Sequence, residues 1–142
     1  DVVDELSDPM LDAIRVAVKR ANPEALVLGE VWEDASNKKA YGRRRTYFTN
    51  AELDSVMNYP YRTAILNFMR GFDSGAKLKE TVMSIAENYP PQVVACNMNL
   101  LGTHDTPRIL TALVDVSVLP VIIGCAVFGL VTAKLMERKV QK

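Results

Sequence analysis

The sequence has few residues of the kinds that build metal and redox centres, with only two cysteines and one histidine among 142 residues. Cys96 and Cys125 lack the spacing of metal ligands, so we predict two buried free thiols, with neither a zinc site nor a disulfide framework. No Gly-x-Gly-x-x-Gly or Walker-type sequence follows an apolar run, which argues against a nucleotide-binding fold. Net charge is also absent, because 17 basic and 17 acidic side chains cancel. The broad basic field of a nucleic-acid-binding protein is therefore missing, and nucleic acid is not an expected partner.

The composition is otherwise that of a folded globular protein. Hydrophobic residues make up 49% of the chain and charged residues 24%, and this length favours a single compact domain. The charge is unevenly distributed, however. Residues 116–142 contain four basic side chains and one acidic one, so a net charge of +3 there balances −3 over residues 1–115. We therefore place a boundary near Asp115.

Segments with helical periodicity alternate with short apolar runs. Asp8-Pro9 is a typical helix start, with Asp8 as the capping residue, and Asn22-Pro23 a typical stop. Strands are expected at 25–30, 53–57 and 93–101, and further helices at 61–70, at 77–88 and from Thr106 onward. The polar, arginine-rich stretch around 43–45 is expected to be a loop, and no function is assigned to it. The alternation predicts a parallel sheet, either part of a (β/α) barrel or a doubly wound sheet, and periodicity alone does not separate the two.

Three carboxylates occupy comparable places in this pattern. Asp1 is the first residue, Glu30 ends an expected strand, and Asp105 follows the last expected strand. Barrel enzymes carry their chemistry at strand ends, and glycoside hydrolysis requires one carboxylic acid together with a second carboxylate. The alternative for Glu30, which has Glu33 and Asp34 beside it, is an ordinary exposed loop acid.

Two further residues near these carboxylates have a structural and a functional interpretation. His104, the only histidine, adjoins Asp105 and is either a structural loop residue or part of a reactive site. Trp32, the only tryptophan, follows Glu30 by two residues. It is either a core residue or an aromatic face on which a sugar ring stacks.

Three segments together resemble a known family. They are GEVWEDA at residues 29–35, LDSVMNYPYR at residues 53–62 and LLGTHDTPR at residues 100–108. In this order and spacing they resemble the alpha-amylase superfamily of glycoside hydrolases, in particular its cyclomaltodextrinase, neopullulanase and maltogenic amylase branch. The resemblance spans residues 1 to about 115.

The resemblance implies an α/β fold, a partial TIM (β/α)8 barrel that runs from the end of strand 4 to the start of helix 7. About half of a complete barrel is then missing, including the first signature region, the arginine that precedes Asp1 in the family pattern, and the eighth strand. The implied function is that of a fragment of a retaining α-glucan hydrolase acting on maltooligosaccharides, cyclodextrins or pullulan. We expect the isolated chain to be inactive.

The resemblance also implies a role for each candidate residue. Asp1 corresponds to the nucleophile, Glu30 to the general acid/base and Asp105 to the carboxylate that stabilises the transition state, while His104 hydrogen-bonds the sugar. Trp32 is a candidate substrate-binding residue from its position beside Glu30 alone. Retention requires two carboxyl groups about 5 to 5.5 Å apart, and a protonated Glu30 requires a raised pKa. No cofactor or metal is expected; calcium occurs in the family, but nothing in this sequence indicates it. A homodimer is compatible with the complete enzyme.

The last segment departs from the family pattern. Residues 116–133 carry no charge, and basic residues follow at 134, 138, 139 and 142. Eighteen residues just reach the length of a membrane span, with a cytoplasmic type of flank. Three explanations of the hydrophobic helical tail at 116–142 stay open: a reading-frame artefact, a membrane anchor, or a buried helix that caps the half barrel. The alternative function is a non-catalytic, membrane-tethered remnant that at most binds glucans. A cytoplasmic location is expected unless the anchor is genuine.

Overall fold

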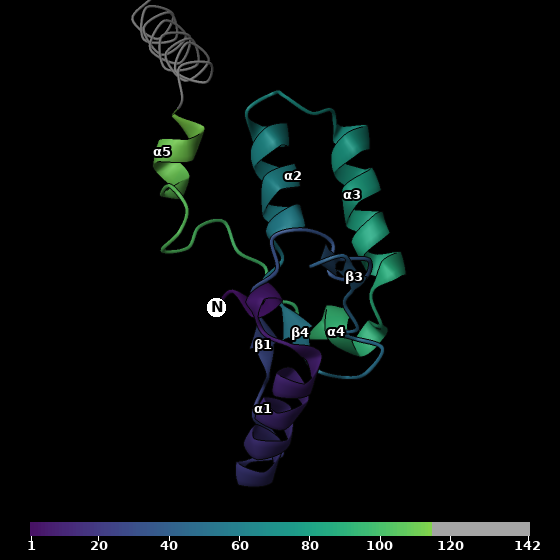
Figure 1. Cartoon of the computed structure of the whole chain (residues 1–142). Helices are drawn as coiled ribbons and strands as arrows, with labels where there is room; N and C mark the ends of the chain where they lie inside the picture. Colours follow the sequence, from purple (N-terminus) through teal and green to yellow (C-terminus); the bar gives the residue numbers. More distant parts are fainter. Residues whose placement is uncertain (115–142) are drawn as a thin grey trace, which may run out of the picture. The chain divides into compact units, whose positions relative to one another are not determined.

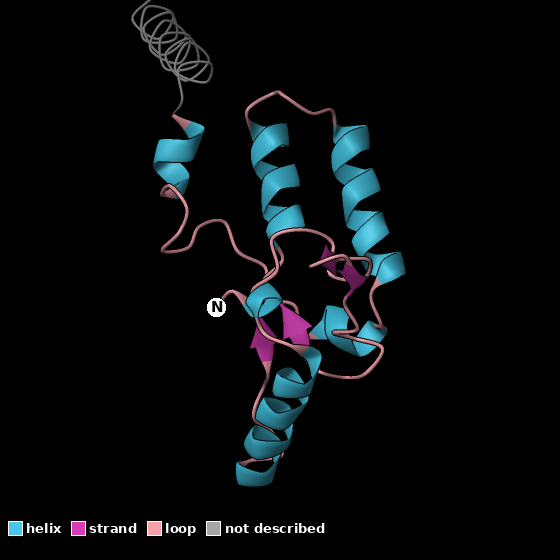
Figure 2. Ribbon diagram, viewed as in Figure 1, coloured by secondary structure: helices cyan, strands magenta, loops and turns pink. Residues whose placement is uncertain are grey.

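The computed structural model of this chain describes residues 1–114, shown in Figures 1 and 2. The chain divides into two compact units, residues 1–101 and a second unit that begins at Gly102, and each is described by itself. In chain order the elements are the 3-10 helix η1 (Val3–Glu5), α1 (Asp8–Ala21), β1 (Leu28–Gly29), β2 (Lys39–Ala40), β3 (Arg43–Arg44), β4 (Ser55–Val56), α2 (Tyr59–Met69), α3 (Gly75–Asn88), α4 (Pro91–Ala95) and α5 (Ile109–Leu113). Only α5 belongs to the described part of the second unit.

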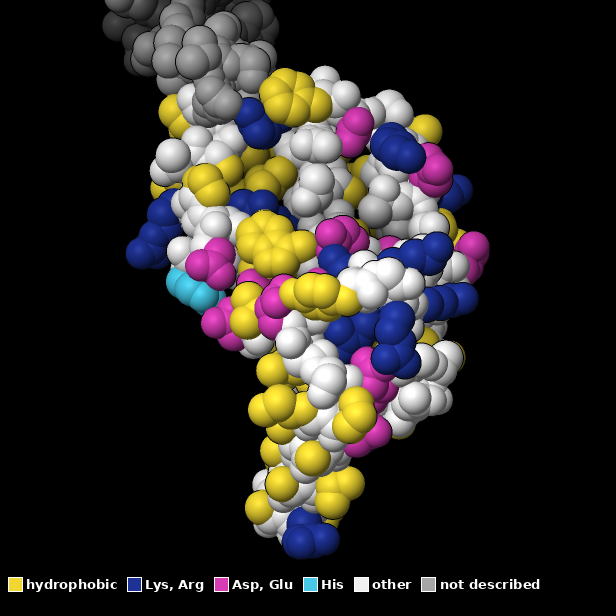
Figure 3. Space-filling view, in the orientation of Figure 1, with side chains coloured by type: hydrophobic (Ala, Val, Ile, Leu, Met, Phe, Trp, Pro, Cys, Tyr) yellow, Lys and Arg dark blue, Asp and Glu magenta, His cyan; other side chains and the backbone are white. Residues whose placement is uncertain are grey.

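Helix α1 begins and ends where the sequence predicts. Ser7, not Asp8, is the N-cap residue. The Asp8 carboxylate instead pairs with the Arg45 guanidinium, with Oδ1 3.0 Å from Nε. One face of α1 buries Leu11, whereas Met10 and Val16 are exposed, and Figure 3 shows apolar side chains along this helix.

The expected parallel pairing is confirmed for the first two strands. β1 pairs in parallel with β4, with Leu28 opposite Ser55 and Gly29 opposite Val56. An isolated parallel bridge joins Met57, the residue after β4, to Met98. This places the carboxyl ends of β1 and β4 at one edge, where Glu30 follows β1 directly.

The expected strand at 93–101 is wrong over most of its length. Pro91–Ala95 forms helix α4, and pairing is limited to the Met98 bridge. The proline at the start of α4 has a φ angle suited to a first helical turn, and Val93 reaches the core from that helix with 4% of its surface exposed. A short apolar run is compatible with either a buried strand or a buried helix, which explains the error. A side-chain hydrogen bond connects α4 to β4, because the Ser55 hydroxyl donates to the Val93 carbonyl at 2.9 Å.

The arginine-rich stretch is a hairpin and not a loop. β2 and β3 pair antiparallel, with Lys39 opposite Arg44. The two turn residues, Tyr41 and Gly42, have φ angles of 54° and 74°, as a tight two-residue hairpin turn requires. The hairpin leads into Arg45, which is buried and donates to the backbone carbonyls of the N-terminal segment.

Helices α2 and α3 lie side by side (Figure 1), joined by a short loop. Asn58 caps α2 by accepting the Tyr61 N–H at 3.3 Å, and Ser74 caps α3 by accepting the Lys77 N–H at 3.2 Å. Both helices begin two residues before the expected positions because the capping side chains precede the apolar periodicity. The expected existence and order of the two helices are confirmed.

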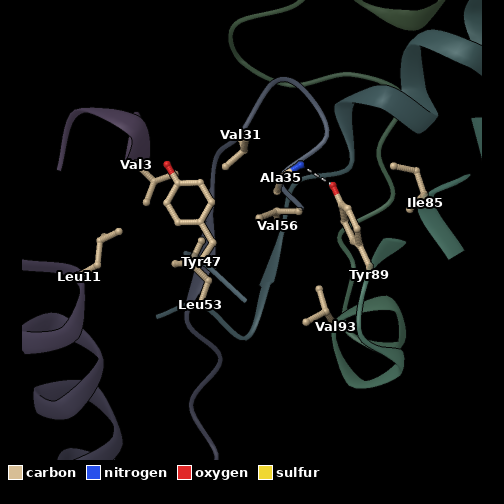
Figure 4. Packing of buried hydrophobic residues seen from close by; sticks show 10 residues of the cluster. All are labelled: Val3, Leu11, Val31, Ala35, Tyr47, Leu53, Val56, Ile85, Tyr89 and Val93. Carbon is tan, nitrogen blue, oxygen red and sulfur yellow. Dashed lines mark hydrogen bonds between the residues drawn. The ribbon is translucent and has the colours of Figure 1, made fainter. Parts of the chain in front are cut away.

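The core of the first unit lies between α1, the parallel strands and the start of α4. Figure 4 shows its ten clustered residues, Val3, Leu11, Val31, Ala35, Tyr47, Leu53, Val56, Ile85, Tyr89 and Val93. A free thiol at Cys96 is confirmed, but its predicted burial is wrong, because Cys96 is exposed just after α4. Cys125 lies outside the described residues.

The predicted boundary near Asp115 and the tail at 116–142 lie outside the described residues, and so does the predicted span at 116–133. The expected helix from Thr106 is present but begins later, at Ile109. Within residues 1–114, no helix combines the length and the apolar composition needed to cross a membrane.

Candidate active site

Glu30 is positioned by a tight contact at the end of β1. A Cβ atom added to Gly29 would lie 2.5 Å from Leu53 Cδ1 and 3.3 Å from Val3 Cγ1. Both neighbours are buried, so any larger residue at this position would have to displace the Leu53 side chain. The next residue, Glu30, is thereby held against the core.

Glu30 is buried, which contradicts the alternative of an exposed loop acid. Only 4% of its surface is exposed, whereas the Glu33 side chain three residues later is 62% exposed. A buried carboxylate requires hydrogen-bond donors. The Val2 N–H donates to Glu30 Oε2 and the Tyr59 hydroxyl donates to Glu30 Oε1, each at 3.0 Å. Each oxygen of this carboxylate therefore has a donor.

Val2 reaches Glu30 in a strained conformation. Its φ and ψ angles are 41° and 44°, in the left-handed region, which is a marked outlier for a β-branched residue. The turn of η1 follows immediately and buries Val3. This arrangement holds the N-terminal segment against Glu30, so Asp1, which is exposed, is attached to the residue that contacts Glu30.

Trp32 lies over Tyr59. The two rings stack with their centroids 4.1 Å apart and their planes at 11°. Tyr59 is 1% exposed, whereas Trp32 is 49% exposed. Trp32 is therefore not a core residue. The two stacked rings lead from the buried Tyr59 to the exposed face of Trp32, two residues after Glu30.

Tyr59 is a site residue that was not predicted from the sequence. It lies within LDSVMNYPYR and begins α2 directly after the strand that pairs with β1. Its place beyond a strand end is the same kind of signal that identified Glu30. Asn58 fixes its backbone, because the Asn58 N–H donates to the Met98 carbonyl at 3.0 Å.

His104 and Asp105 belong to the second unit, where both are exposed. His104 Nε2 lies 3.1 Å from Asp105 Oδ2. Thr103 and Thr106 shape this loop, since the Thr103 N–H donates to Thr106 Oγ1 at 2.8 Å. A pocket of about 540 Å³ lies beside the loop, lined by Gly102, Thr103, His104, Thr106, Arg108 and Ile109.

The structure thus groups the predicted site residues in two sets. Glu30, Trp32 and the segment that carries Asp1 meet in the first unit, and His104 pairs with Asp105 in the second. The convergence of all five stays a prediction, and so does the expectation that no metal or cofactor takes part.

Comparison with known proteins identifies the family. The model of the alpha amylase catalytic domain matches residues 7–128. This chain belongs to the alpha-amylase family. The predicted family is confirmed, and with it an α/β fold that is a fragment of a TIM barrel.

Individual relatives place the chain in the expected branch. It is 37% identical over 112 residues to a cyclomaltodextrinase of Geobacillus thermopakistaniensis, covering 78% of this chain and 18% of that protein. It is 34% identical over 113 residues to neopullulanase 2 of Thermoactinomyces vulgaris, covering 79% and 18%. A solved cyclic alpha-maltosyl-(1→6)-maltose hydrolase from Arthrobacter globiformis superimposes with a TM-score of 0.71 at 25% identity, covering 80% of this chain and 24% of that one. The chain therefore spans about a fifth of the length of these curated relatives.

Proposed function

We propose that this chain carries the general acid/base of a retaining α-glucan hydrolase. The substrates are α-1,4 glucosidic bonds, and also α-1,6 bonds, in maltooligosaccharides, cyclodextrins or pullulan. The observation that supports this most strongly is Glu30 itself, a buried carboxyl group with a donor on each oxygen at the end of a parallel strand. The names of the relatives support the substrate class, since they include a cyclomaltodextrinase and a neopullulanase.

In the proposed reaction, Glu30 donates its proton to the glycosidic oxygen while the Asp1 carboxylate attacks the anomeric carbon. The C–O bond to the leaving sugar breaks, and a covalent glycosyl ester forms on Asp1. Glu30 then removes a proton from a water molecule, which attacks the same carbon and restores the Asp1 carboxylate. Asp105 stabilises the positive charge that develops on the sugar, and His104 binds a sugar hydroxyl beside it.

Trp32 is proposed to bind substrate next to the cleaved bond. Its inner face already packs on Tyr59, and about half of its surface is exposed. A pyranose ring has apolar C–H faces that pack well on an aromatic ring. A sugar held on Trp32 lies close to Glu30, which is two residues away in the chain.

A non-catalytic glucan-binding role is the second candidate, and the exposed half of Trp32 is the observation that favours it. Its membrane-tethered form concerns residues 116–142, outside the described residues. For the first candidate we propose a cytoplasmic location, no metal cofactor and, for the complete enzyme, a homodimer. An exposed free thiol such as Cys96 is compatible with a reducing compartment.

The test is a chimera in which the aligned segment of the Geobacillus cyclomaltodextrinase is replaced by the aligned residues of this chain. We expect hydrolysis of β-cyclodextrin, with newly formed reducing ends that are first α-configured by proton NMR. Glu30→Gln should lower kcat about 10³-fold, within the range for loss of a general acid. The matched control is Glu33→Gln, an exposed acid three residues away, which should leave kcat unchanged. β-Configured products, or full activity of Glu30→Gln, would contradict the hydrolase proposal.

Binding separates the two candidates in the 142-residue chain itself. Trp32 is the only tryptophan, so its fluorescence reports directly on glucan binding. A saturable change of this fluorescence on adding maltoheptaose, combined with an inactive chimera, would favour the binding role; no change would count against it.

A further inference from the structure

We propose that Tyr59 is a positioning residue for Glu30, and that Trp32 keeps Tyr59 in place. The hydroxyl of Tyr59 sets the orientation of the Glu30 carboxyl group and stabilises its ionised form. This inference deepens the proposed function, because it gives the acid/base a partner that accommodates both of its protonation states.

The Val2 and Tyr59 donors on Glu30 differ in whether they can also accept a hydrogen bond. The Val2 N–H on Oε2 is a backbone donor that has no acceptor role. The Tyr59 hydroxyl on Oε1 both donates and accepts, depending on how its hydrogen is turned. When Glu30 is protonated at Oε1, the new O–H can donate to the Tyr59 oxygen after that hydroxyl turns away. Protonation at Oε2 would instead oppose the Val2 N–H.

The catalytic proton is therefore carried on Oε1, the oxygen that faces Tyr59. The Oε1–H turns from Tyr59 toward the glycosidic oxygen and its proton passes to the leaving group, after which the Tyr59 hydroxyl turns back and donates to the new carboxylate. No bond to Tyr59 forms or breaks in either step, because only the direction of one hydrogen bond reverses.

The ring of Tyr59 is held on several sides. Its backbone begins α2 directly after Asn58, which is tied both to the Met98 carbonyl and, through its side-chain N–H, to Asn99 Oδ1 at 2.9 Å. Trp32 stacks on the ring at 4.1 Å from the same loop that carries Glu30. The hydroxyl thus has little freedom to leave Glu30, and a sugar on Trp32 would further restrict the stack.

Several charged side chains lie on the segments that pack around Glu30. These are Asp1, Asp4 and Glu5 on the N-terminal segment, Glu33 and Asp34 after Trp32, and Arg62 on the first turn of α2. All of them remain when Tyr59 is changed to phenylalanine. A difference in Glu30 titration between Tyr59→Phe and the unchanged chain therefore reports on the hydroxyl alone.

The test is a pH titration of glutamate side-chain carboxyl carbons by ¹³C NMR in the 142-residue chain, with Glu30 assigned by its loss in Glu30→Gln. A donor to a charged group contributes enough to move a titration midpoint by about one pH unit. We expect Tyr59→Phe to raise the Glu30 midpoint by about this amount, because the ionised form loses a donor. Tyr47→Phe is the matched control: Tyr47 is also buried and donates its hydroxyl to a different carboxylate, that of Asp4. An unchanged midpoint in Tyr59→Phe would overturn the inference.

A second test changes Trp32 and leaves the buried Tyr59 unaltered, so it works even if the core does not tolerate Tyr59→Phe. Trp32→Ala removes the stacking partner from a half-exposed position and should raise the Glu30 midpoint in the same direction by a smaller amount, while Trp32→Phe should restore it. An unchanged midpoint in Trp32→Ala would overturn the role given to Trp32. These titrations need no turnover, so an inactive chimera would count against the proposed function and leave the result for Tyr59 standing.

Discussion

Lys19 on α1 holds the carboxylate of Asp54, with Nζ 2.8 Å from Oδ2. Arg15 lies 2.7 Å from Oδ1 of the same carboxylate, and the Val27 N–H donates to it at 2.8 Å. Partial burial alone would raise the Asp54 pKa, but the three donors outweigh it and lower the pKa to about 2. We call this group of contacts around Asp54 the clasp. It connects α1 to the residue before β1 and to the residue before β4. It therefore holds together the helix and the two strands that position Glu30.

Asp54→Asn should destabilise the fold at neutral pH. The folded-state pKa lies below the usual value of 3.8, so the ionised clasp contributes stability above about pH 4 and loses it as the pH falls toward 2. A shift of this size corresponds to about 2 kcal/mol at pH 7. Urea unfolding should show that difference at pH 7 and a much smaller one near pH 2.

The control for this clasp is the exposed pair of Lys77 and Glu80 on α3, whose side chains are 55% and 68% exposed. Glu80→Gln should change stability by no more than about 0.5 kcal/mol. An equal loss in Asp54→Asn and Glu80→Gln would contradict the importance given to Asp54.

Gly29→Ala should destabilise the chain by about 1 to 3 kcal/mol, because the new methyl group would overlap Leu53 in a packed core. Gly75→Ala is the matched change at the start of α3, where a Cβ would meet Phe68 at an ordinary 3.6 Å. That variant should gain roughly 0.5 to 1 kcal/mol from the lower entropy of its unfolded state. Thermal unfolding of both variants measures the contrast, and a stable Gly29→Ala would show that β1 has more room than the structure indicates.

Tyr89→Phe should cost about 1 to 3 kcal/mol, since the buried Ala35 N–H then loses its only acceptor shown in the structure, the Tyr89 oxygen at 2.9 Å. Burial also raises the pKa of Tyr89 to about 12, so its hydroxyl stays protonated across the working range of pH. Tyr61→Phe, at a partly exposed position on α2, should stay within about 0.5 kcal/mol. Denaturant midpoints that move equally in the two variants would refute this account of Tyr89.

Val2→Gly should stabilise the chain modestly, by up to about 1 kcal/mol. Relief of left-handed strain at a branched residue outweighs the extra flexibility of glycine in the unfolded chain, and Val2 is 57% exposed. Val16→Gly is the matched control, because Val16 is equally exposed, at 56%, but lies within α1. This change should destabilise the chain, because glycine is unfavourable in the interior of a helix. Calorimetry of the two variants should give shifts in melting temperature of opposite sign.

The parts of the fold that could be predicted from sequence are those with local signals. The proline and capping pattern around Pro9 located α1, and the apolar run ending at Gly29 located β1. α4 was mistaken for a strand because Val93 and Val94 are equally suited to either structure. The hairpin was missed because its signal, two positive φ angles at Tyr41 and Gly42, depends on a non-glycine residue that seldom adopts them.

For the candidate site, the identity of the residues was available from the sequence but their environment was not. Glu30 and Trp32 were found from their place after a strand. The burial of Glu30 depends on Val2 and Tyr59, which lie 28 and 29 positions away in sequence. No local pattern reveals a hydrogen bond between such distant residues, so the contact of Tyr59 with Glu30 emerged only from the folded chain.

In the proposed reaction, Glu30 donates the proton that releases the leaving sugar. The most direct measurement is kcat/KM of the chimera and its Glu30→Ala variant on two substrates, maltotetraose and α-maltosyl fluoride. Fluoride leaves with little help from an acid, and kcat/KM reports on the step in which the glycosidic bond breaks. We predict a loss of about 10³-fold on maltotetraose and a far smaller loss on the fluoride. Equal losses on both substrates would contradict the assignment of Glu30 as the general acid.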